Sequence, residues 1–316
     1  MRSRRAITKA NALLILLLGA STLVRSQQPV DELTEIVVRA PEPRFVAPTR
    51  RDKIGRIWAP VFINGNGPFR LVLDTGANHS AITASVALAL GLAPDPSKQV
   101  LLRGVTGNAI VPTVRVDSFA VGDVILTSAT LPIIADALGG AEGVLGTDGF
   151  AGMRIYIDFK HDMITISRSH DERVPADFTS VKLEPSPAHL LITRAQIGDV
   201  RVHAIIDTGG QATIGNEAMR VALLPRRSHG TADHVIDVTA TSQDAQYYES
   251  RPIQLGKITI QGARISYGDM HIFEHWHLIK EPAVLIGMDV IGLLDVFIID
   301  YRRRDLVVKL GTNHSH

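Results

Sequence analysis

Two aspartates, Asp74 and Asp207, stand in the same short motif, and together they could do acid–base chemistry. Each begins an Asp-Thr-Gly tripeptide that follows three apolar residues. Two carboxyl groups held about 3 Å apart do not both ionise easily, so the pKa of one falls and the pKa of the other rises. The pair then shares one proton, and it can take a proton from water while it gives one to a carbonyl oxygen. Hydrolysis of a peptide bond by water requires this chemistry.

The other residues of each tripeptide have mechanical roles in this interpretation. Gly76 and Gly209 let the backbone approach the carboxylates and donate N–H hydrogen bonds to them. Thr75 and Thr208 carry hydroxyls that can bond across to the opposite loop and hold the two loops together. An Asp-Thr-Gly after a strand can also be an ordinary turn. Two copies in register favour the paired-carboxylate interpretation.

The sequence around the two tripeptides is repeated as well. Asp74 precedes Gly122 by 48 residues, and Asp207 precedes Gly256 by 49. Each copy continues with two apolar residues and a glycine, and then with an apolar run that ends in aspartate and an aromatic residue. Self-similarity of this kind indicates a duplicated structural unit. Two units related by an approximate twofold axis would bring the two Asp loops face to face.

Both copies are predicted to be rich in β-structure. The turn signals Asn64-Gly65-Asn66-Gly67 and Gly198-Asp199 each lie between two apolar stretches, which is typical of a hairpin. Each copy has a predicted hairpin before its aspartate and a short helix after it. In the first copy these are strands 56–63 and 69–73 and helix 84–90. In the second copy they are strands 189–197 and 200–206 and helix 217–223.

These motifs resemble those of the retropepsin-like aspartic peptidases. In that family an Asp-Thr-Gly-Ala after an apolar strand carries the catalytic aspartate. A later apolar-apolar-Gly motif packs beside it, as Val144-Leu145-Gly146 and Leu285-Ile286-Gly287 would here. Retroviral members assemble the site from two identical chains, whereas this chain resembles the fused single-chain form of bacterial relatives, from about residue 51 to residue 310.

The resemblance implies a mainly β fold with two pseudo-twofold related β-barrel lobes of the retropepsin or pepsin kind. It implies a peptide or protein substrate and no cofactor. It also assigns the site residues, with Asp74 and Asp207 as the catalytic dyad and Thr75, Gly76, Thr208 and Gly209 as its support.

The residue after each glycine affects the expected pH optimum. Pepsin-like enzymes usually have Ser or Thr there, whose hydroxyl can stabilise the ionised carboxylate, whereas this chain has Ala77 and Gly210. Without those hydroxyls the dyad should keep its shared proton to higher pH. We therefore expect an optimum at about pH 5–7.

A flap that covers the substrate is expected in the first copy. Gly104 lies 30 residues after Asp74, and a pair of glycines between apolar stretches suits the tip of a hairpin that opens for substrate. Contacts with substrate are assigned to the four residues of this tip, Gly104, Val105, Thr106 and Gly107. The counterpart at 237–241 lacks glycine, which predicts one working flap and one modified loop.

The run His271-Ile272-Phe273-Glu274-His275 matches the His-x-x-Glu-His pattern of some zinc peptidases. That chemistry needs the motif on a helix and a further Glu ligand. Here the motif lies in an insertion, since Gly287 follows Gly256 by 31 residues whereas Gly146 follows Gly122 by only 24. Neighbouring turn signals predict a surface loop or a short strand. A zinc peptidase built on His271, Glu274 and His275 stays an alternative, and no metal site is predicted.

Composition and charge exclude several classes of partner and site. The 316 residues are 45% hydrophobic and 21% charged, which is normal for a globular protein. Residues 1–26 hold five of the 33 basic residues and no acidic one, so the remainder has 28 basic and 32 acidic residues and a net charge of −4. A mildly acidic protein lacks the charge pattern of nucleic-acid binding. The basic run Arg302-Arg303-Arg304 lies between two apolar stretches and is therefore interpreted as a hairpin turn and not as a site for an anionic partner. The absence of cysteine excludes disulfides, thiol catalysis, a lipidated cysteine anchor and cysteine-based zinc sites.

The first 26 residues have the pattern of a secretory signal. Four basic residues precede an apolar run at 12–18 that continues weakly to residue 24. This run is shorter than the roughly 20 apolar residues of a membrane-spanning helix. Cleavage after Ser26 and a partial twin-arginine pattern predict a periplasmic or secreted protein without stable membrane association, expected to be a monomer. An uncleaved membrane anchor is the alternative.

The sequence therefore predicts an exported aspartic endopeptidase, with a catalytically silent peptide-binding module of the same fold as the alternative. Gly210 and Gln211 stand where the first copy has Ala77 and Asn78, which favours the binding module slightly. The predicted order of domains is a signal peptide at 1–26, an N-terminal arm at 27–50, a first lobe at 51–170, a linker at 171–187, a second lobe at 188–311 and a tail at 312–316.

Overall fold

The structure is a computed structural model that describes residues 55–136, 138–184, 190–236, 239, 242–268 and 270–310. In these residues the chain forms 21 strands and four short helices, so the predicted mainly β fold is confirmed. None of the described helices is long and apolar enough to cross a membrane. The predicted signal peptide, N-terminal arm and C-terminal tail lie outside the described residues.

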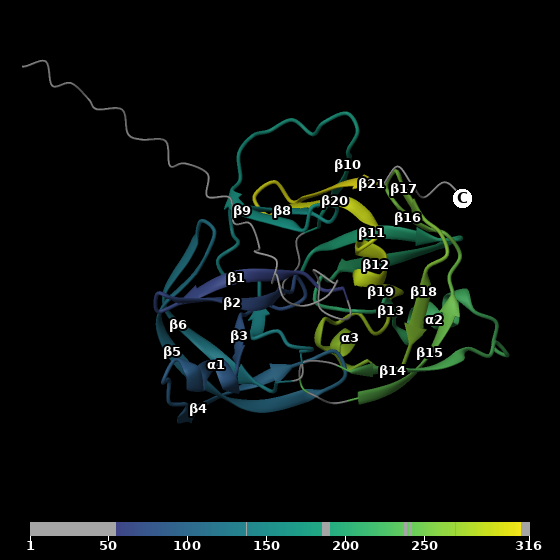
Figure 1. Cartoon of the computed structure of the whole chain (residues 1–316). Helices are drawn as coiled ribbons and strands as arrows, with labels where there is room; N and C mark the ends of the chain where they lie inside the picture. The colour runs from purple at the N-terminus through teal and green to yellow at the C-terminus, as the bar shows by residue number, and fades with distance from the viewer. Residues whose placement is uncertain are drawn as a thin grey trace, which may run out of the picture. The chain divides into compact units, whose positions relative to one another are not determined.

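The first copy forms a closed barrel of six strands with a seventh at its edge (Figure 1). In order around the barrel the strands are β1 (Trp58–Ile63), β2 (Asn66–Leu73), β7 (Gly143–Leu145), β3 (Ala81–Thr83), β6 (Val124–Ile134) and β5 (Asn108–Val121), followed by the edge strand β4 (Asp95–Arg103). The ring closes because β1 pairs with β5 as well as with β2. Closure leaves β4 as the outer strand of a hairpin with β5.

The first hairpin forms where the sequence predicts it. Asn64 and Gly65 connect β1 to β2, and both have positive φ angles, 50° and 74°. Two successive left-handed residues are what a two-residue hairpin turn of type I′ requires, and Asn-Gly is its favoured pair. The side-chain oxygen of Asn64 also accepts hydrogen bonds from the N–H groups of Asp117 and Ser118, at 2.8 and 3.1 Å. The turn residue therefore joins the hairpin to β5.

The second copy repeats this strand order in an interrupted form. Its sheet runs β14 (Thr231–Ile236), β15 (Ser242–Glu249), β18 (Arg264–Tyr267), β13 (Ile214–Gly215), β19 (Ala283–Ile286), β12 (Val200–Ile206), β11 (Ile192–Ile197), β16 (Ile253–Leu255) and β17 (Ile258–Ile260). Two shorter strands, β15 and β16, replace the long β5, and β17 and β18 replace β6. Pro252 lies in the first break, and proline has no N–H with which to continue a strand ladder. The closing pair of the first copy, β1 with β5, recurs as β11 with β16.

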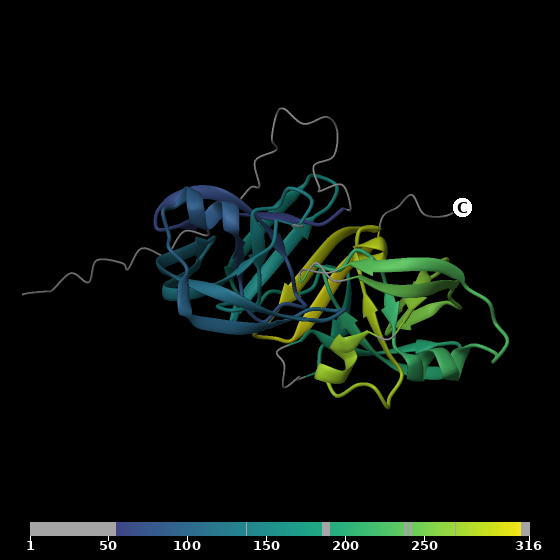
Figure 2. The ribbon, with the colours of Figure 1, turned by 90° about the horizontal axis from the view of Figure 1, so that it is seen from below.

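A five-stranded sheet combines strands from both copies (Figure 2). Its order is β10 (Thr179–Lys182), β21 (Asp305–Leu310), β20 (Leu294–Asp300), β8 (Met153–Asp158) and β9 (Met163–Arg168). The central pairing joins β20 of the second copy to β8 of the first. Strand β10 lies in the range 171–187, so the predicted linker also supplies an edge strand of this sheet. The three arginines at 302–304 lie in the turn between β20 and β21, as the sequence predicts.

Two of the four helices follow the Asp-Thr-Gly tripeptides, as predicted. These are α1 (Ala84–Ala89) and α2 (Glu217–Leu223). A third helix, α3 (His271–His275), forms where a surface loop or short strand was expected, so that prediction was wrong. The fourth, α4 (Met288–Ile291), follows the second apolar-apolar-Gly motif.

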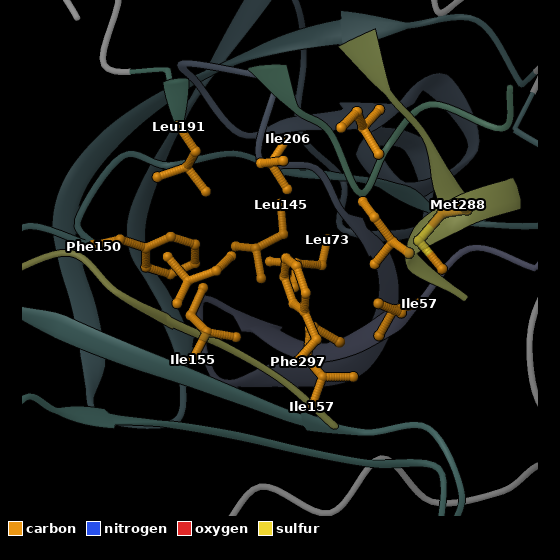
Figure 3. Packing of buried hydrophobic residues seen from close by; sticks show 14 of the residues in the cluster. Ile57, Leu73, Leu145, Phe150, Ile155, Ile157, Leu191, Ile206, Met288 and Phe297 are labelled. Atoms are coloured by element: carbon orange, nitrogen blue, oxygen red, sulfur yellow. The ribbon is translucent and has the colours of Figure 1, made fainter. Parts of the chain in front are cut away.

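One apolar core extends through both copies (Figure 3). Leu73 and Leu145 of the first copy lie in the same buried cluster as Ile206 and Phe297 of the second. Leu73 and Ile206 are the residues directly before the two aspartates, so the core holds the end of each strand. Burial of one such side chain stabilises the fold by about 1.5–3 kcal/mol. The apolar run before each tripeptide thus fixes the position of the aspartate that follows it.

Candidate active site

Two parallel strand pairs place the aspartates. Strand β2 runs parallel to β7, and β12 runs parallel to β19. At the ends of these pairs the Asp74 N–H donates to the carbonyl of Leu145, and the Asp207 N–H donates to the carbonyl of Ile286, both at 3.0 Å. The two apolar-apolar-Gly motifs therefore lie beside the two Asp loops, as the sequence predicts.

Each carboxylate is held by the backbone of its own loop. One oxygen of Asp74 accepts from the N–H groups of Gly76 and Ala77, at 2.9 and 3.0 Å. One oxygen of Asp207 accepts from the N–H groups of Gly209 and Gly210, at 2.8 and 3.2 Å. The second oxygen of each carboxylate accepts neither of these two hydrogen bonds. The same geometry in both copies is what a pseudo-twofold dyad requires.

The glycines face the opposite carboxylate. A side chain on Gly76 would begin 2.9 Å from the carboxyl carbon of Asp207. A side chain on Gly209 would lie still closer to the carboxyl group of Asp74. Neither φ angle demands glycine, so the reason for glycine at both positions is space. These contacts show that the two carboxyl groups lie together, each against the loop of the other copy.

The threonines bind the two loops to each other. The Thr75 hydroxyl donates to the carbonyl of Ile206 at 2.7 Å and accepts from the N–H of Thr208 at 3.1 Å. In return the Thr208 hydroxyl donates to the carbonyl of Leu73 at 2.6 Å and accepts from the N–H of Thr75 at 3.2 Å. Both threonines are buried. Each hydroxyl uses its donor and one acceptor site, so the four bonds fix the spacing between the loops.

Burial is the main cause of raised pKa values in both aspartates. The negative charge of Asp207 and a hydrogen bond between the two carboxyl groups raise the pKa of Asp74 further, well above its ordinary value. The pKa of Asp207 is also raised by burial, but the N–H groups of Gly209, Gly210 and Gly76 and the bond to Asp74 counteract the rise. The pair therefore retains one shared proton at pH values where ordinary carboxyl groups are ionised, and two apparent pKa values describe it.

A second pair of carboxylates, Asp148 and Asp289, accepts hydrogen bonds from the chain just after each Asp-Thr-Gly tripeptide, and the sequence interpretation assigned this pair no role. Asp148 accepts from the Ser80 hydroxyl at 2.6 Å, and that hydroxyl accepts from the N–H of Gly146 at 3.1 Å. In the second copy Asp289, Thr213 and Gly287 make the same bonds. The sequence did contain a signal for this pair, since an aspartate stands two residues after the glycine of each apolar-apolar-Gly motif. Asp289 is exposed to solvent on one side, but partial desolvation by its surroundings raises its pKa above the ordinary value, and its bonds to Thr213 act in the opposite direction.

The four predicted flap residues form the tip of the β4–β5 hairpin. The Gly104 N–H donates to the carbonyl of Gly107 at 2.8 Å and closes the turn. Gly104 and Thr106 are buried, and the tip contacts α3 of the second copy. The equivalent hairpin of the second copy is β14–β15, and most of its predicted tip lies outside the described residues. The role of the first tip as a flap stays a prediction.

The zinc-like motif lies on α3, and its first histidine is placed between Asn108 and Glu274, the second of which belongs to the same motif. One ring nitrogen of His271 lies 2.8 Å from the Asn108 amide nitrogen, and the other lies 3.5 Å from a Glu274 carboxylate oxygen. Burial lowers the pKa of His275, and the nearby Arg103, together with His271 and His277 when they are protonated, acts in the same direction. Among the described residues, no three histidine or acidic side chains are grouped so that they could hold a metal ion.

Comparison with known families agrees with the two-copy geometry. A family model described as aspartyl protease matches the chain twice, at residues 59–148 and 193–290. Each match contains one Asp-Thr-Gly tripeptide and one apolar-apolar-Gly motif. The search of curated proteins returned no match. The two matched regions together cover more than half of the chain, which therefore belongs to the aspartyl protease family.

Proposed function

We propose that this protein is an aspartic endopeptidase that hydrolyses peptide bonds with a water molecule activated by Asp74 and Asp207. The observation that carries the proposal is the mutual packing of the two loops, in which Gly76 leaves room for Asp207 and Gly209 leaves room for Asp74. A protein that only binds peptides has no chemical need for two adjacent carboxyl groups with raised pKa values. The same pair is suited to acid–base catalysis near neutral pH.

The proposed reaction begins with the dyad holding one proton. The ionised carboxylate takes a proton from water, the water oxygen attacks the carbonyl carbon, and the protonated carboxyl group gives its proton to the carbonyl oxygen. A tetrahedral gem-diol results. The dyad then returns one proton to the amide nitrogen and takes one from a hydroxyl of the diol, so the C–N bond breaks and an acid and an amine leave. The dyad ends with the single proton it had at the start.

The backbone around the dyad supports each stage of this cycle. The N–H groups of Gly76, Ala77, Gly209 and Gly210 hold one oxygen of each carboxylate, which leaves the other oxygens for water and substrate. Asp207 is 5% exposed, whereas Asp74 retains part of its surface. A positioned group in a site with little water needs no reorganisation during the reaction. The cycle uses only these side chains, a water molecule and the substrate.

The proposal includes export and a peptide or protein substrate. The basic and apolar pattern of residues 1–26 supports export to the periplasm or the exterior, and the absence of cysteine is compatible with either compartment. Because Ala77 and Gly210 add no hydroxyl beside the carboxylates, the expected optimum remains about pH 5–7. A pH–rate profile that peaks below pH 4 would contradict this part of the proposal.

A cleavage assay tests the proposed function. The fragment 27–316 should cleave casein or members of a peptide library, and a statine-type inhibitor should abolish the cleavage. Asp74→Asn and Asp207→Asn should each remove it as well. Cleavage that survives either substitution would exclude the aspartic mechanism, and cleavage that a chelator stops while Asp74→Asn does not would favour a zinc enzyme. Binding of peptides without cleavage would favour the silent binding module.

A further inference from the structure

The tip of the first-copy hairpin is bound to an element that only the second copy contains. Helix α3 lies in the stretch between Gly256 and Gly287, which is seven residues longer than its counterpart between Gly122 and Gly146. Figure 1 draws the β4–β5 hairpin reaching to this helix, and three kinds of contact join them. We call residues 104–108 the flap tip.

A backbone hydrogen bond makes the flap tip the N-terminal cap of α3. The first N–H groups of a helix have no partner within it and are usually satisfied by a capping side chain. The N-cap residue of α3 is Met270, which supplies no such bond. The N–H of Ile272 instead donates to the carbonyl of Val105 at 3.2 Å. The short helix and the flap tip therefore stabilise each other.

A side-chain bond lies next to this backbone bond. The Asn108 amide nitrogen is 2.8 Å from Nε2 of His271, and Nδ1 of the same ring is 3.5 Å from Glu274. A neutral His271 with its proton on Nδ1 points that proton at the carboxylate and accepts the Asn108 N–H at Nε2. His275 is the last residue of the same helix, and the charges that act on it are those of Arg103, at the end of β4, and of His271 and His277.

Apolar packing continues from the flap tip towards the dyad. Val105 packs against the buried cluster that contains Ile272, Phe273 and Leu285. A methyl group of Leu285 lies 3.1 Å from the place where a side chain on Gly210 would begin. Gly210 donates its N–H to Asp207. The cluster is thus continuous from the hairpin of the first copy to the catalytic loop of the second.

We propose that α3 is a docking platform for the flap and that Asn108 and His271 are positioning residues for the reaction. This proposal rests on the proposed peptidase function. In the docked form the flap tip of the first copy is held by α3 of the second copy. Helix α3 thus supplies the partner that the tip of a second working flap would otherwise supply. A substrate enters when the tip leaves α3, and redocking restores the arrangement in which the dyad acts.

Kinetics of matched variants test the positioning role. Asn108→Ala and His271→Ala should each lower kcat by about threefold to tenfold, the value of one hydrogen bond, with KM unchanged or reduced because the flap opens more readily. His271→Gln should restore kcat, since its side-chain oxygen can reach the position of Nε2 and accept from Asn108. His277→Asn, at an exposed neighbour with a left-handed φ of 59°, is the control and should leave both constants unchanged. Equal kcat values in wild type and His271→Ala would overturn the proposal.

Cross-linking tests the need for opening. The natural chain contains no cysteine, so Asn108→Cys combined with His271→Cys gives a single reactive pair. A short bis-maleimide should join the two positions within one chain and reduce kcat/KM for a protein substrate by more than about tenfold below that of the same double variant before treatment, whereas the reagent should change each single variant much less relative to its own untreated form. Full activity after complete cross-linking would show that the tip need not leave α3.

Hydrogen exchange separates this proposal from the proposed function. In the unmodified protein the amides of residues 104 and 272 should exchange slowly, and His271→Ala should accelerate both together, whether or not any peptide is cleaved. If the protein cleaves nothing while both amides respond in this way, the peptidase function and the positioning role fail but the docking stands. If His271→Ala leaves both exchange rates unchanged, the docking itself is refuted.

Discussion

Thr75 and Thr208 hold the two Asp-Thr-Gly loops together through hydroxyls that each donate one hydrogen bond and accept another. Replacement of Thr75 by Val keeps the shape of the side chain and removes the bonds to the Ile206 carbonyl and the Thr208 N–H. Both groups are buried, so the free energy of unfolding should fall by about 2–4 kcal/mol. Thr75→Ser keeps the hydroxyl and should cost about 1 kcal/mol or less. Urea unfolding of the three proteins measures the difference, and equal midpoints for Val and Ser would contradict this role.

The dyad itself should reduce stability at neutral pH. A carboxyl group whose folded-state pKa lies above its unfolded value binds more protons in the folded state, so stability falls as pH rises through the interval between the two values. Asp74→Asn removes that penalty, which is about 1.4 kcal/mol for each unit of pKa. The melting temperature of the variant should exceed that of wild type at pH 7, by about 2–4 °C per kcal/mol, and the gain should vanish near pH 4.

Thermal melts between pH 4 and pH 7 check this sign. Asp199→Asn is the matched control, because the Asp199 side chain is 95% exposed and its replacement should change the melting temperature little at any pH. An Asp74→Asn variant that melts below wild type at pH 7 would show that the native carboxyl group contributes stability there, against the direction of its pKa.

At the level of single residues, the sequence predicted what is local and missed what is paired over a distance. The roles of Gly76 and Thr75 follow from a tripeptide and its repeat, since the physical reasons for each residue type lie within the loop. Ser80 and Asp148 are 68 residues apart, and nothing in either residue type predicts that the two form a hydrogen bond. The repeat of the aspartate after each glycine was visible, but its partner depends on how β3 and β7 pair in space.

Among the elements, α2 and the segment before β19 are joined by one buried side chain. Asn216 caps α2 by accepting from the N–H of Met219 at 2.9 Å and also accepts from Ala283 at 3.1 Å. Its amide nitrogen donates to the carbonyls of Leu278 and Glu281, at 2.6 and 2.7 Å. The amide side chain thus accepts two hydrogen bonds and donates two, and only 2% of the residue is exposed. Asn216 therefore positions the strand that carries the second apolar-apolar-Gly motif.

Asn216→Asp should destabilise the protein in a pH-dependent way. The acceptor that caps α2 remains, but a carboxylate oxygen replaces the donor and faces two carbonyl oxygens. The loss should be about 3 kcal/mol or more at pH 7. Burial and these carbonyls raise the folded-state pKa of the new carboxyl group, so the loss should shrink as pH falls and protonation restores one donor. Unfolding in urea at pH 5 and pH 7 measures this, and an equal loss at both values would contradict it.

The failure to predict α3 also has a cause at the level of elements. A five-residue helix with no capping side chain is not stable by itself, and its sequence is compatible with a loop or a strand. The carbonyl that caps it belongs to Val105, in the other copy. Helices α1 and α2 were predictable because each directly follows a repeated motif and presents apolar residues to the local core.

Over the whole molecule, the shared core and the β8–β20 pairing should make the two copies unfold together. One buried cluster contains residues from both, and the five-stranded sheet has its central pairing between them. The chain has two tryptophans, Trp58 in the first copy and Trp276 in the second, so Trp58→Phe and Trp276→Phe each leave a reporter of one copy. Their fluorescence midpoints in urea should coincide with each other and with the circular dichroism midpoint.

Separate midpoints for the two reporters would show that the copies are independent folding units, and the shared sheet would then contribute little to stability. This sheet was the part of the fold that the sequence did not indicate. The runs at 155–159 and 297–301 were recognisable as repeated landmarks, but a repeat does not reveal that its members pair with each other. The strand β10 was hidden for a similar reason, because its range is polar and bounded by prolines.

If the proposed mechanism is right, cleavage requires one aspartate from each copy, and the two single variants and the double variant together measure this requirement. We predict that kcat/KM for a cleaved peptide falls by at least about 10³-fold in Asp74→Asn and in Asp207→Asn, and that the double variant is no less active than either single one, because two groups that share one proton act as a unit. If one single variant kept most of its activity, or if the double variant lost the product of the two single losses, the two carboxyl groups would not form one catalytic dyad.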